Sequence, residues 1–289
     1  MMISAPGYVI VARPADDDVF LGDEATAARV AEFVRRIREF ARPEISIPPC
    51  QIEVRQAIPS HSGLGSGTQL GLAVARALSE LAGEHDVPVE KLARRAGRGL
   101  RSAIGLHGFG RGGFLVDGGR SGPDQLGSLV ARVDFPADWR LILATPPQSQ
   151  GLSGADEQQA FAAQPPMPHS LTAELCRVVL IEWLPALNTA DFAQASAAMY
   201  EFGLGVGRFF EPVQGDVFAD PLMNELAREL RIAGVEGVAQ TSWGPTICIL
   251  AANEASATEL ARDLAAEPHW SGCSFRMVEP LNHGASVTR

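Results

Sequence analysis

Hydrophobic and polar residues follow two different periods in the first half of the chain. Between residues 51 and 58, apolar side chains fall on alternate positions, which is the period of a strand with one buried face. Between residues 24 and 40 they recur every three or four positions, as in an amphipathic helix. The same patterns predict strands at 8–12, 114–117 and 141–144, and helices at 70–81 and 87–96.

The second half of the chain has a different order of predicted elements. Helices around 171–187 and 191–210 are followed by a helix (221–233), a strand (246–251), a helix (256–266) and a strand (275–279). Ser153 and Asp156 have the spacing of a capping box, which predicts a further helix through Phe161. The final order suggests an antiparallel ferredoxin-like sheet with helices on one face. We therefore expect an α+β protein with two domains, 1–136 and 137–289.

A glycine-rich stretch, PSHSGLGSGTQ at residues 59–69, separates a predicted strand from a predicted helix. Its glycines permit positive φ, and the helix N-terminus that follows presents N–H groups to an anion. The stretch lacks the lysine of a Walker loop, the G-x-G-x-x-G spacing and the register of a nucleophile elbow. It is therefore an anion cradle or a plain strand-to-helix turn, and its own residues leave both open.

Composition and charge narrow the class of protein. The net charge of −10 argues against general binding of nucleic acid or anionic membranes, and 46% apolar residues indicate a globular chain. The four cysteines form no CxxC pair, so we expect free thiols in a reducing compartment. The start has no basic leader and no apolar run long enough to span a bilayer. We expect a cytoplasmic protein, with a homodimer as one candidate oligomeric state.

A group of arginines stands out against this acidic background. Arg94, Arg98 and Arg101 recur at helical spacing, and the guanidinium group matches the geometry of phosphate oxygens. The alternative is a solvated helix face paired with surface acids. Gly97 and Gly99 interrupt the helical pattern, which favours a phosphate site on a loop.

The glycine-rich stretch resembles the phosphate-binding motif of the GHMP kinase superfamily, Pro-x-x-x-Gly-Leu-Gly-Ser-Ser. Gly67, Thr68 and Gln69 depart from the usual Ser-Ala-Ala and are similar to the β-ribofuranosylaminobenzene 5′-phosphate synthase branch. Further segments match that branch in order: GRGLRSAIGLHGFGRGGFLVDGG (97–119), GLSGADEQQAF (151–161), VGRFFEPVQGD (206–216) and QTSWGPT (240–246). The resemblance implies a two-domain GHMP kinase fold, with an α/β N-terminal domain and a ferredoxin-like C-terminal domain.

The resemblance also implies a reaction. Many GHMP kinases carry a catalytic aspartate, and Leu106 stands where it is expected, although homoserine kinases also lack it. The synthase branch joins phosphoribosyl pyrophosphate to 4-aminobenzoate with loss of pyrophosphate and carbon dioxide, and Mg²⁺ is the expected cofactor. An ATP-dependent small-molecule kinase and a non-catalytic phospho-ligand binder remain as alternatives. The family resembled here begins with a further N-terminal strand segment, so the resemblance implies one of two expectations: that the start of this chain was assigned too late, or that the chain is a truncated and inactive form.

The candidate site residues fall into two groups. Catalytic candidates are Asp117 (for Mg²⁺ or ribose, otherwise a turn cap), His107 (titratable, otherwise structural) and Gln214. Trp243 is a candidate for stacking on the aromatic acceptor, with simple packing as the alternative. The residues expected to bind phosphate or substrate are Gly63, Leu64, Gly65, Ser66, Gly67, Thr68, Gln69, Arg98, Arg101, Ser102, Gln240, Ser242, Trp243 and Gly244.

Overall fold

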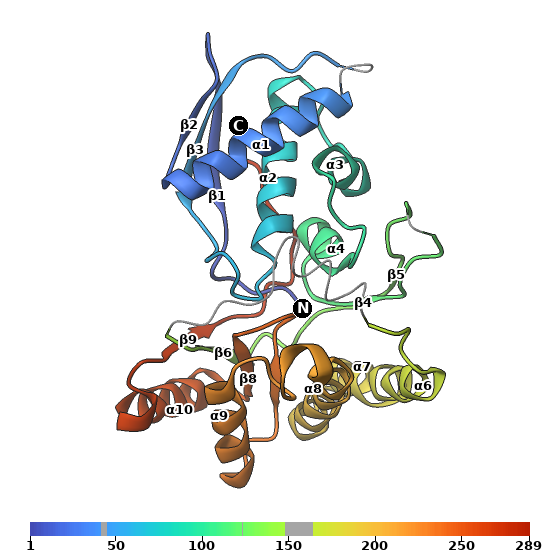
Figure 1. The fold of residues 1–289 in the computed structure, drawn as a ribbon, viewed down its shortest axis with the longest axis vertical. Helices are drawn as coiled ribbons and strands as arrows, with labels where there is room; N and C mark the ends of the chain where they lie inside the picture. The colour runs from blue at the N-terminus through green and yellow to red at the C-terminus, as the bar shows by residue number, and fades with distance from the viewer. Residues whose placement is uncertain (42–44, 123, 148–163) are drawn as a thin grey trace. The chain divides into compact units, whose positions relative to one another are not determined.

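The chain forms two compact units, seen in a computed structural model that describes residues 1–41, 45–122, 124–147 and 164–289 (Figure 1). The first unit contains Met1–Ser60, Gly65–Arg132 and Leu281–Arg289, and the second contains His61–Leu64 and Val133–Pro280. The predicted second domain ran to residue 289, whereas Leu281–Arg289 group with the first unit. The glycine-rich stretch is also divided, because His61–Leu64 group with the second unit and the residues on either side of them group with the first.

The first unit is built on a three-stranded sheet with the order β1-β3-β2. Strand β3 pairs antiparallel with β1 and parallel with β2. Helices α1 and α2 lie beside each other against this sheet (Figure 1). The elements are β1 (Val9–Pro14), β2 (Val19–Leu21), α1 (Glu24–Ala41), β3 (Cys50–Gln56), α2 (Ser66–Leu81), α3 (Val89–Ala96), α4 (Ile104–Arg111), β4 (Phe114–Asp117) and β5 (Leu129–Val133).

The predicted apolar stripes form the core of this unit. Val30, Phe33, Val34 and Ile37 of α1 pack with the buried side of α2 and with Ile52 of β3. The sequence did not predict α4, because glycines break its helical pattern. In the structure those glycines admit close neighbours. The side chain of Met2 packs against Gly108, and the backbone of His283 packs against Gly112.

The second unit has a four-stranded antiparallel sheet with the order β7-β8-β6-β9. Its β-α-β-β-α-β sequence of elements is the ferredoxin-like arrangement that was predicted. Helices α8, α9 and α10 pack on one side of the sheet (Figure 1). The elements are β6 (Arg140–Thr145), α6 (His169–Arg177), η1 (Val178–Trp183), α7 (Leu184–Thr189), α8 (Phe192–Gln214), α9 (Pro221–Ile232), β7 (Val238–Gln240), β8 (Ile247–Ala251), α10 (Glu254–Ala266), η2 (Pro268–Trp270) and β9 (Ser274–Val278). The predicted capping box at Ser153 lies outside the described residues.

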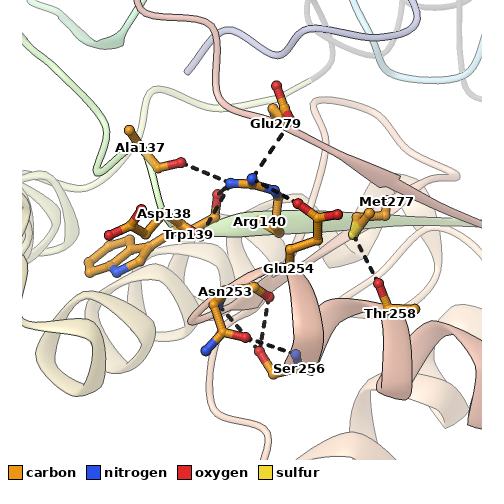
Figure 2. A network of polar contacts seen from close by, with 10 residues as sticks. All are labelled: Ala137, Asp138, Trp139, Arg140, Asn253, Glu254, Ser256, Thr258, Met277 and Glu279. Carbon is orange, nitrogen blue, oxygen red and sulfur yellow. Dashed lines mark hydrogen bonds and ion pairs between the residues drawn. The ribbon is translucent and has the colours of Figure 1, made fainter.

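Arg140 ties three elements of the second unit together (Figure 2). Its Nη1 donates to the carbonyl oxygens of Ala137, Asp138 and Trp139 at 2.8, 3.2 and 3.0 Å. Its Nη2 lies 3.2 Å from Glu254 at the start of α10 and 3.6 Å from Glu279 just after β9. One guanidinium therefore fixes the start of β6 against the ends of two other elements.

Among the described residues, no helix is long and apolar enough to cross a membrane.

Candidate functional site

The N-terminus of α2 is built from the second part of the glycine-rich stretch. Gly65 is the N-cap residue and has φ 70°, the left-handed conformation that glycine tolerates best. Its carbonyl oxygen accepts from the N–H groups of Thr68 and Gln69, both at 3.1 Å. Gly65 has no side chain to cap the helix, so the positive end of the helix dipole at Ser66 and Gly67 is not shielded by a capping side chain.

Two arginines, one on helix α1 and one on the loop after α3, converge on this helix end. A Cβ atom placed on Gly67 would lie 3.6 Å from Nη2 of Arg29 and 3.6 Å from Nη2 of Arg98. Arg98 follows α3, and its guanidinium lies over the Phe33 ring at 4.9 Å from the centroid. Arg29 lies on α1, and its Nη1 donates to Ser60 Oγ at 2.9 Å. The predicted phosphate residue Arg98 thus lies beside the predicted phosphate loop.

The charges around Arg98 are mostly of one sign. Burial is the largest cause that lowers the pKa of Arg98, and the positive charges of Arg29, Arg101 and Arg36 lower it further. Glu32 is the opposing charge that raises it. Holding like charges together is unfavourable unless an anion joins them, so this arrangement is suited to a group with several negative charges.

Arg29 and Arg36 were missed by the sequence reasoning, although a signal was present. They are seven residues apart on α1, which places them on one face of the helix two turns apart. The guanidinium of Arg36 packs directly on the α-carbon of Gly97, the left-handed C-cap of α3 with φ 63°. Gly97 is therefore required both by its conformation and by the arginine that covers it.

Thr68 and Gln69 contact the first turn of α4. Gln69 Nε2 donates to the carbonyl oxygen of Gly105 at 2.9 Å, and the Thr68 methyl would lie 3.0 Å from a Cβ on Gly105. Leu106 is fully buried in the core of the first unit. The residue of α4 that faces the phosphate loop is therefore Gly105, and it offers no carboxylate for kinase chemistry.

Asp117 and His107 are held by backbone groups, and the side chains of both lie against Gly127. The carboxylate of Asp117 accepts from the N–H of Ala103 at 2.7 Å and of Gly119 at 2.9 Å. His107 is 7% exposed, and its Nε2 lies 2.9 Å from the carbonyl oxygen of Gly127. Through these contacts Asp117 joins the end of β4 to the start of α4. The catalytic roles predicted for Asp117 and His107 stay predictions.

The remaining candidates of the first unit are at the same end of α4. Ser102 is exposed, and its Oγ accepts from the N–H of Ile104 at 3.4 Å. Arg101 is exposed and lies close enough to Arg98 to lower the pKa of that residue. Arg101 therefore belongs to the cationic group around Arg98, whereas the contact given for Ser102 is with the start of α4.

The second unit holds the other predicted residues around one turn. Gly63 has φ 75°, and a Cβ there would overlap the carbonyl oxygen of Thr241 and lie 2.9 Å from that of Gly244. Leu64 adjoins Gly63, and Ser242 is an exposed residue of the turn with φ 47°. Gly63 of the glycine-rich stretch thus packs on the QTSWGPT turn.

Gln214, Gln240 and Trp243 stabilise this turn in the structure. Gln240 Nε2 donates to Gln214 Oε1 at 3.2 Å, and Gln214 Nε2 donates to the Val217 carbonyl at 2.7 Å. Trp243 is 7% exposed and makes an edge contact with Phe210 at 4.9 Å between ring centroids. These positions favour packing over acceptor stacking for Trp243 and give Gln214 a positioning role.

Comparisons with known proteins define the class first. The GHMP kinases N terminal domain matches residues 26–111. Galactokinase of Lactococcus lactis superposes with a TM-score of 0.67 and 15% identity, covering 98% of this chain and 87% of that one. Homoserine kinase of Cytophaga hutchinsonii gives a TM-score of 0.65 at 17% identity, covering 98% and 88%. The fold is that of the GHMP kinases, as the sequence predicted.

The more similar sequences define the family. A β-ribofuranosylphenol 5′-phosphate synthase of Methanothermobacter thermautotrophicus is 32% identical, over 85% of this chain and 78% of its own length. One from Archaeoglobus fulgidus is 30% identical, over 97% of this chain and 85% of its own length. The chain belongs to the β-ribofuranosylphenol 5′-phosphate synthase family. The resemblance to the synthase branch is thus confirmed and is favoured over the kinase interpretation.

Proposed function

We propose that this protein condenses phosphoribosyl pyrophosphate with 4-aminobenzoate, releasing pyrophosphate and carbon dioxide. The observation that carries the proposal is the convergence of Arg29 and Arg98 on the unshielded N-terminus of α2, in a chain of the synthase family. A phosphorylated sugar donor needs an anion-binding site of this kind for its phosphate groups.

The chemistry can proceed without a covalent enzyme nucleophile. The ring carbon that carries the carboxylate attacks C1 of the ribose, and the C1–oxygen bond breaks with its electron pair going to pyrophosphate. The bond to the carboxylate then breaks, carbon dioxide leaves, and its electron pair restores the aromatic ring. The protein must align two substrates and stabilise the charge of the leaving group. We assign the binding of that leaving group to Arg98, Arg101 and the N–H groups at Ser66 and Gly67.

Mg²⁺ is part of the proposal as a companion of the substrate. The donor set beside α2 is cationic, with Glu32 as the acid that acts on Arg98, and both oxygens of Asp117 accept backbone N–H groups. These residues do not fit a protein-held Mg²⁺ site, and we assign the metal's ligands to the pyrophosphate group itself.

All four cysteines are free thiols, which supports the expected cytoplasmic location.

The test follows carbon dioxide and pyrophosphate together. Protein is incubated with phosphoribosyl pyrophosphate, Mg²⁺ and carboxyl-labelled 4-aminobenzoate, and labelled carbon dioxide is expected in equal amount to pyrophosphate. Because the relatives are named for a phenol product, carboxyl-labelled 4-hydroxybenzoate is tested as the competing acceptor. Turnover of 4-hydroxybenzoate alone would correct the acceptor. Phosphate transfer from ATP to an alcohol, without carbon dioxide release, would refute the synthase and support a kinase.

A further inference from the structure

We propose that Arg29 on α1 is a binding residue for the diphosphate group of the donor and makes the α2 site selective for diphosphate over a single phosphate. The inference deepens the proposed function and takes the identity of the donor from it. The inference itself concerns only binding: two guanidinium groups, one from α1 and one from the loop after α3, bind the same polyanion at the N-terminus of α2.

The geometry places Arg29 on the same side of Gly67 as Arg98. Both Nη2 atoms lie 3.6 Å from the position of a Gly67 Cβ, and glycine leaves that space open. A ligand group beside the Gly67 backbone can therefore accept hydrogen bonds from both arginines and from the first turn of α2. A larger side chain at residue 67 would fill this space.

Arg29 is also held in place by its neighbours. Ser60 Oγ accepts from Nη1 at 2.9 Å, which leaves Nη2 directed toward Gly67. The Tyr8 hydroxyl is buried, and the charge of Arg29 lowers the Tyr8 pKa against the larger raising effect of burial. A guanidinium fixed before the ligand arrives loses less side-chain entropy on binding.

The charge of the site matches a diphosphate better than a monophosphate. The positive charge of Arg98 is joined by those of three more arginines, Arg29, Arg36 and Arg101, which lower the Arg98 pKa. The negative charge of Glu32 raises that pKa. A sugar monophosphate carries at most two negative charges, whereas a bound pyrophosphate group carries more. Because repulsion among the arginines falls as more negative charge enters, each arginine contributes most when the ligand is a diphosphate.

The experiment measures binding without turnover. Isothermal titration calorimetry of the full chain with pyrophosphate, inorganic phosphate and ribose 5-phosphate compares wild type with Arg29→Gln. Arg35→Gln is the matched control, because Arg35 lies on the same helix, is 66% exposed and pairs with Glu39 instead. Thermal unfolding of the ligand-free variants is recorded in parallel.

Wild type is expected to bind pyrophosphate more tightly than phosphate. Arg29→Gln should weaken pyrophosphate binding about 10- to 100-fold, the usual effect of removing one charge-assisted hydrogen bond. It should change ribose 5-phosphate binding less than about twofold, and Arg35→Gln should change neither. The Tm of ligand-free Arg29→Gln should be unchanged or raised, because one repulsive charge has been removed.

Two results would overturn the inference. Pyrophosphate affinity within about threefold of wild type in Arg29→Gln removes Arg29 from the site, and a lowered ligand-free Tm together with weaker binding assigns it a structural role. Pyrophosphate binding that depends on Arg29 in a protein that releases no carbon dioxide from either benzoate supports the inference and refutes the proposed function. The two proposals therefore fail separately.

Discussion

Gly63 and Gly65 lie two residues apart in one motif and share a left-handed backbone, yet their surroundings differ. Gly63 has φ 75° and faces the Thr241–Gly244 turn, where a Cβ would overlap the Thr241 carbonyl oxygen and lie 2.6 Å from Thr241 Oγ1. Gly65 has φ 70° and nothing within 4 Å of the same position. Alanine at each position therefore separates the cost of the backbone conformation from the cost of the contact.

The magnitudes follow from these two terms. A non-glycine residue in the left-handed region loses about 1–2 kcal/mol, and this is the whole expected cost of Gly65→Ala. Gly63→Ala adds overpacking against backbone oxygens that can move only with the turn, about 1–3 kcal/mol more. For a unit of this size, each kcal/mol lowers Tm by about 2–4 °C. Together the two terms come to about 2–5 kcal/mol, so we expect Gly63→Ala to lower Tm by about 4–20 °C.

Tryptophan fluorescence is the appropriate assay because it follows the unit that contains Gly63. All four tryptophans belong to the second unit: Trp139, Trp183, Trp243 and Trp270. Thermal unfolding detected at these residues should shift strongly in Gly63→Ala. Gly65 groups with the first unit, so Gly65→Ala is followed by far-ultraviolet circular dichroism and should shift weakly. An equal shift in the two variants would show that the contact with the Thr241–Gly244 turn costs nothing, and the reasoning would be wrong.

Three further predictions concern single side chains. Asp117→Asn should lower the free energy of unfolding by about 1–2 kcal/mol, as expected for a lost capping bond, and leave kcat within about threefold in the carbon dioxide assay. Glu84→Gln weakens the ion pair with fully buried Arg95 and should cost about 1.5–3 kcal/mol at pH 7 in urea unfolding. Arg95 lowers the pKa of Glu84, so this stabilisation is complete above the unfolded carboxyl pKa of about 4.3 and is lost as the pH falls through the lower folded pKa. Burial raises the pKa of the Cys248 thiol to about 12, so iodoacetamide at pH 8 should label exposed Cys176 first, as read by peptide mass spectrometry.

The sequence predicted the helices and strands that carry a regular apolar period. Helix α2 spans Ser66–Leu81, and strand β4 spans Phe114–Asp117, the four residues predicted for it. It missed α4 and the short strands β2, β5 and β7. Helix α4 was missed because the neighbours that require its glycines, Met2 and His283, are far away in the chain.

The candidate site was predicted in part, for a similar reason. Arg98 was found because glycines interrupt its helical pattern, whereas Arg29 was overlooked because α1 has a strong apolar stripe that drew the interpretation to packing. Asp117 and His107 were named catalytic for their chemistry alone. Their partners are main-chain groups, and sequence gives no sign of which backbone N–H or carbonyl a polar side chain will meet.

The side chains around the phosphate loop bear on the type of reaction that the protein catalyses. A kinase needs a group that orients or deprotonates a hydroxyl, and the position of α4 that faces the phosphate loop is Gly105. The carboxylate and the imidazole that lie nearest to Gly105 in the sequence belong to Asp117 and His107, and both are held by backbone groups. The described groups around the α2 N-terminus instead combine N–H donors with arginines. In the proposed reaction, negative charge develops on the oxygens of the leaving pyrophosphate, and N–H donors combined with arginines are the type of donor set that stabilises such charge. The chain has the anion-binding helix end of the GHMP kinase fold, but Gly105 of α4, which faces the phosphate loop, has no carboxylate to activate a hydroxyl. This combination suits the proposed phosphoribosyl transfer.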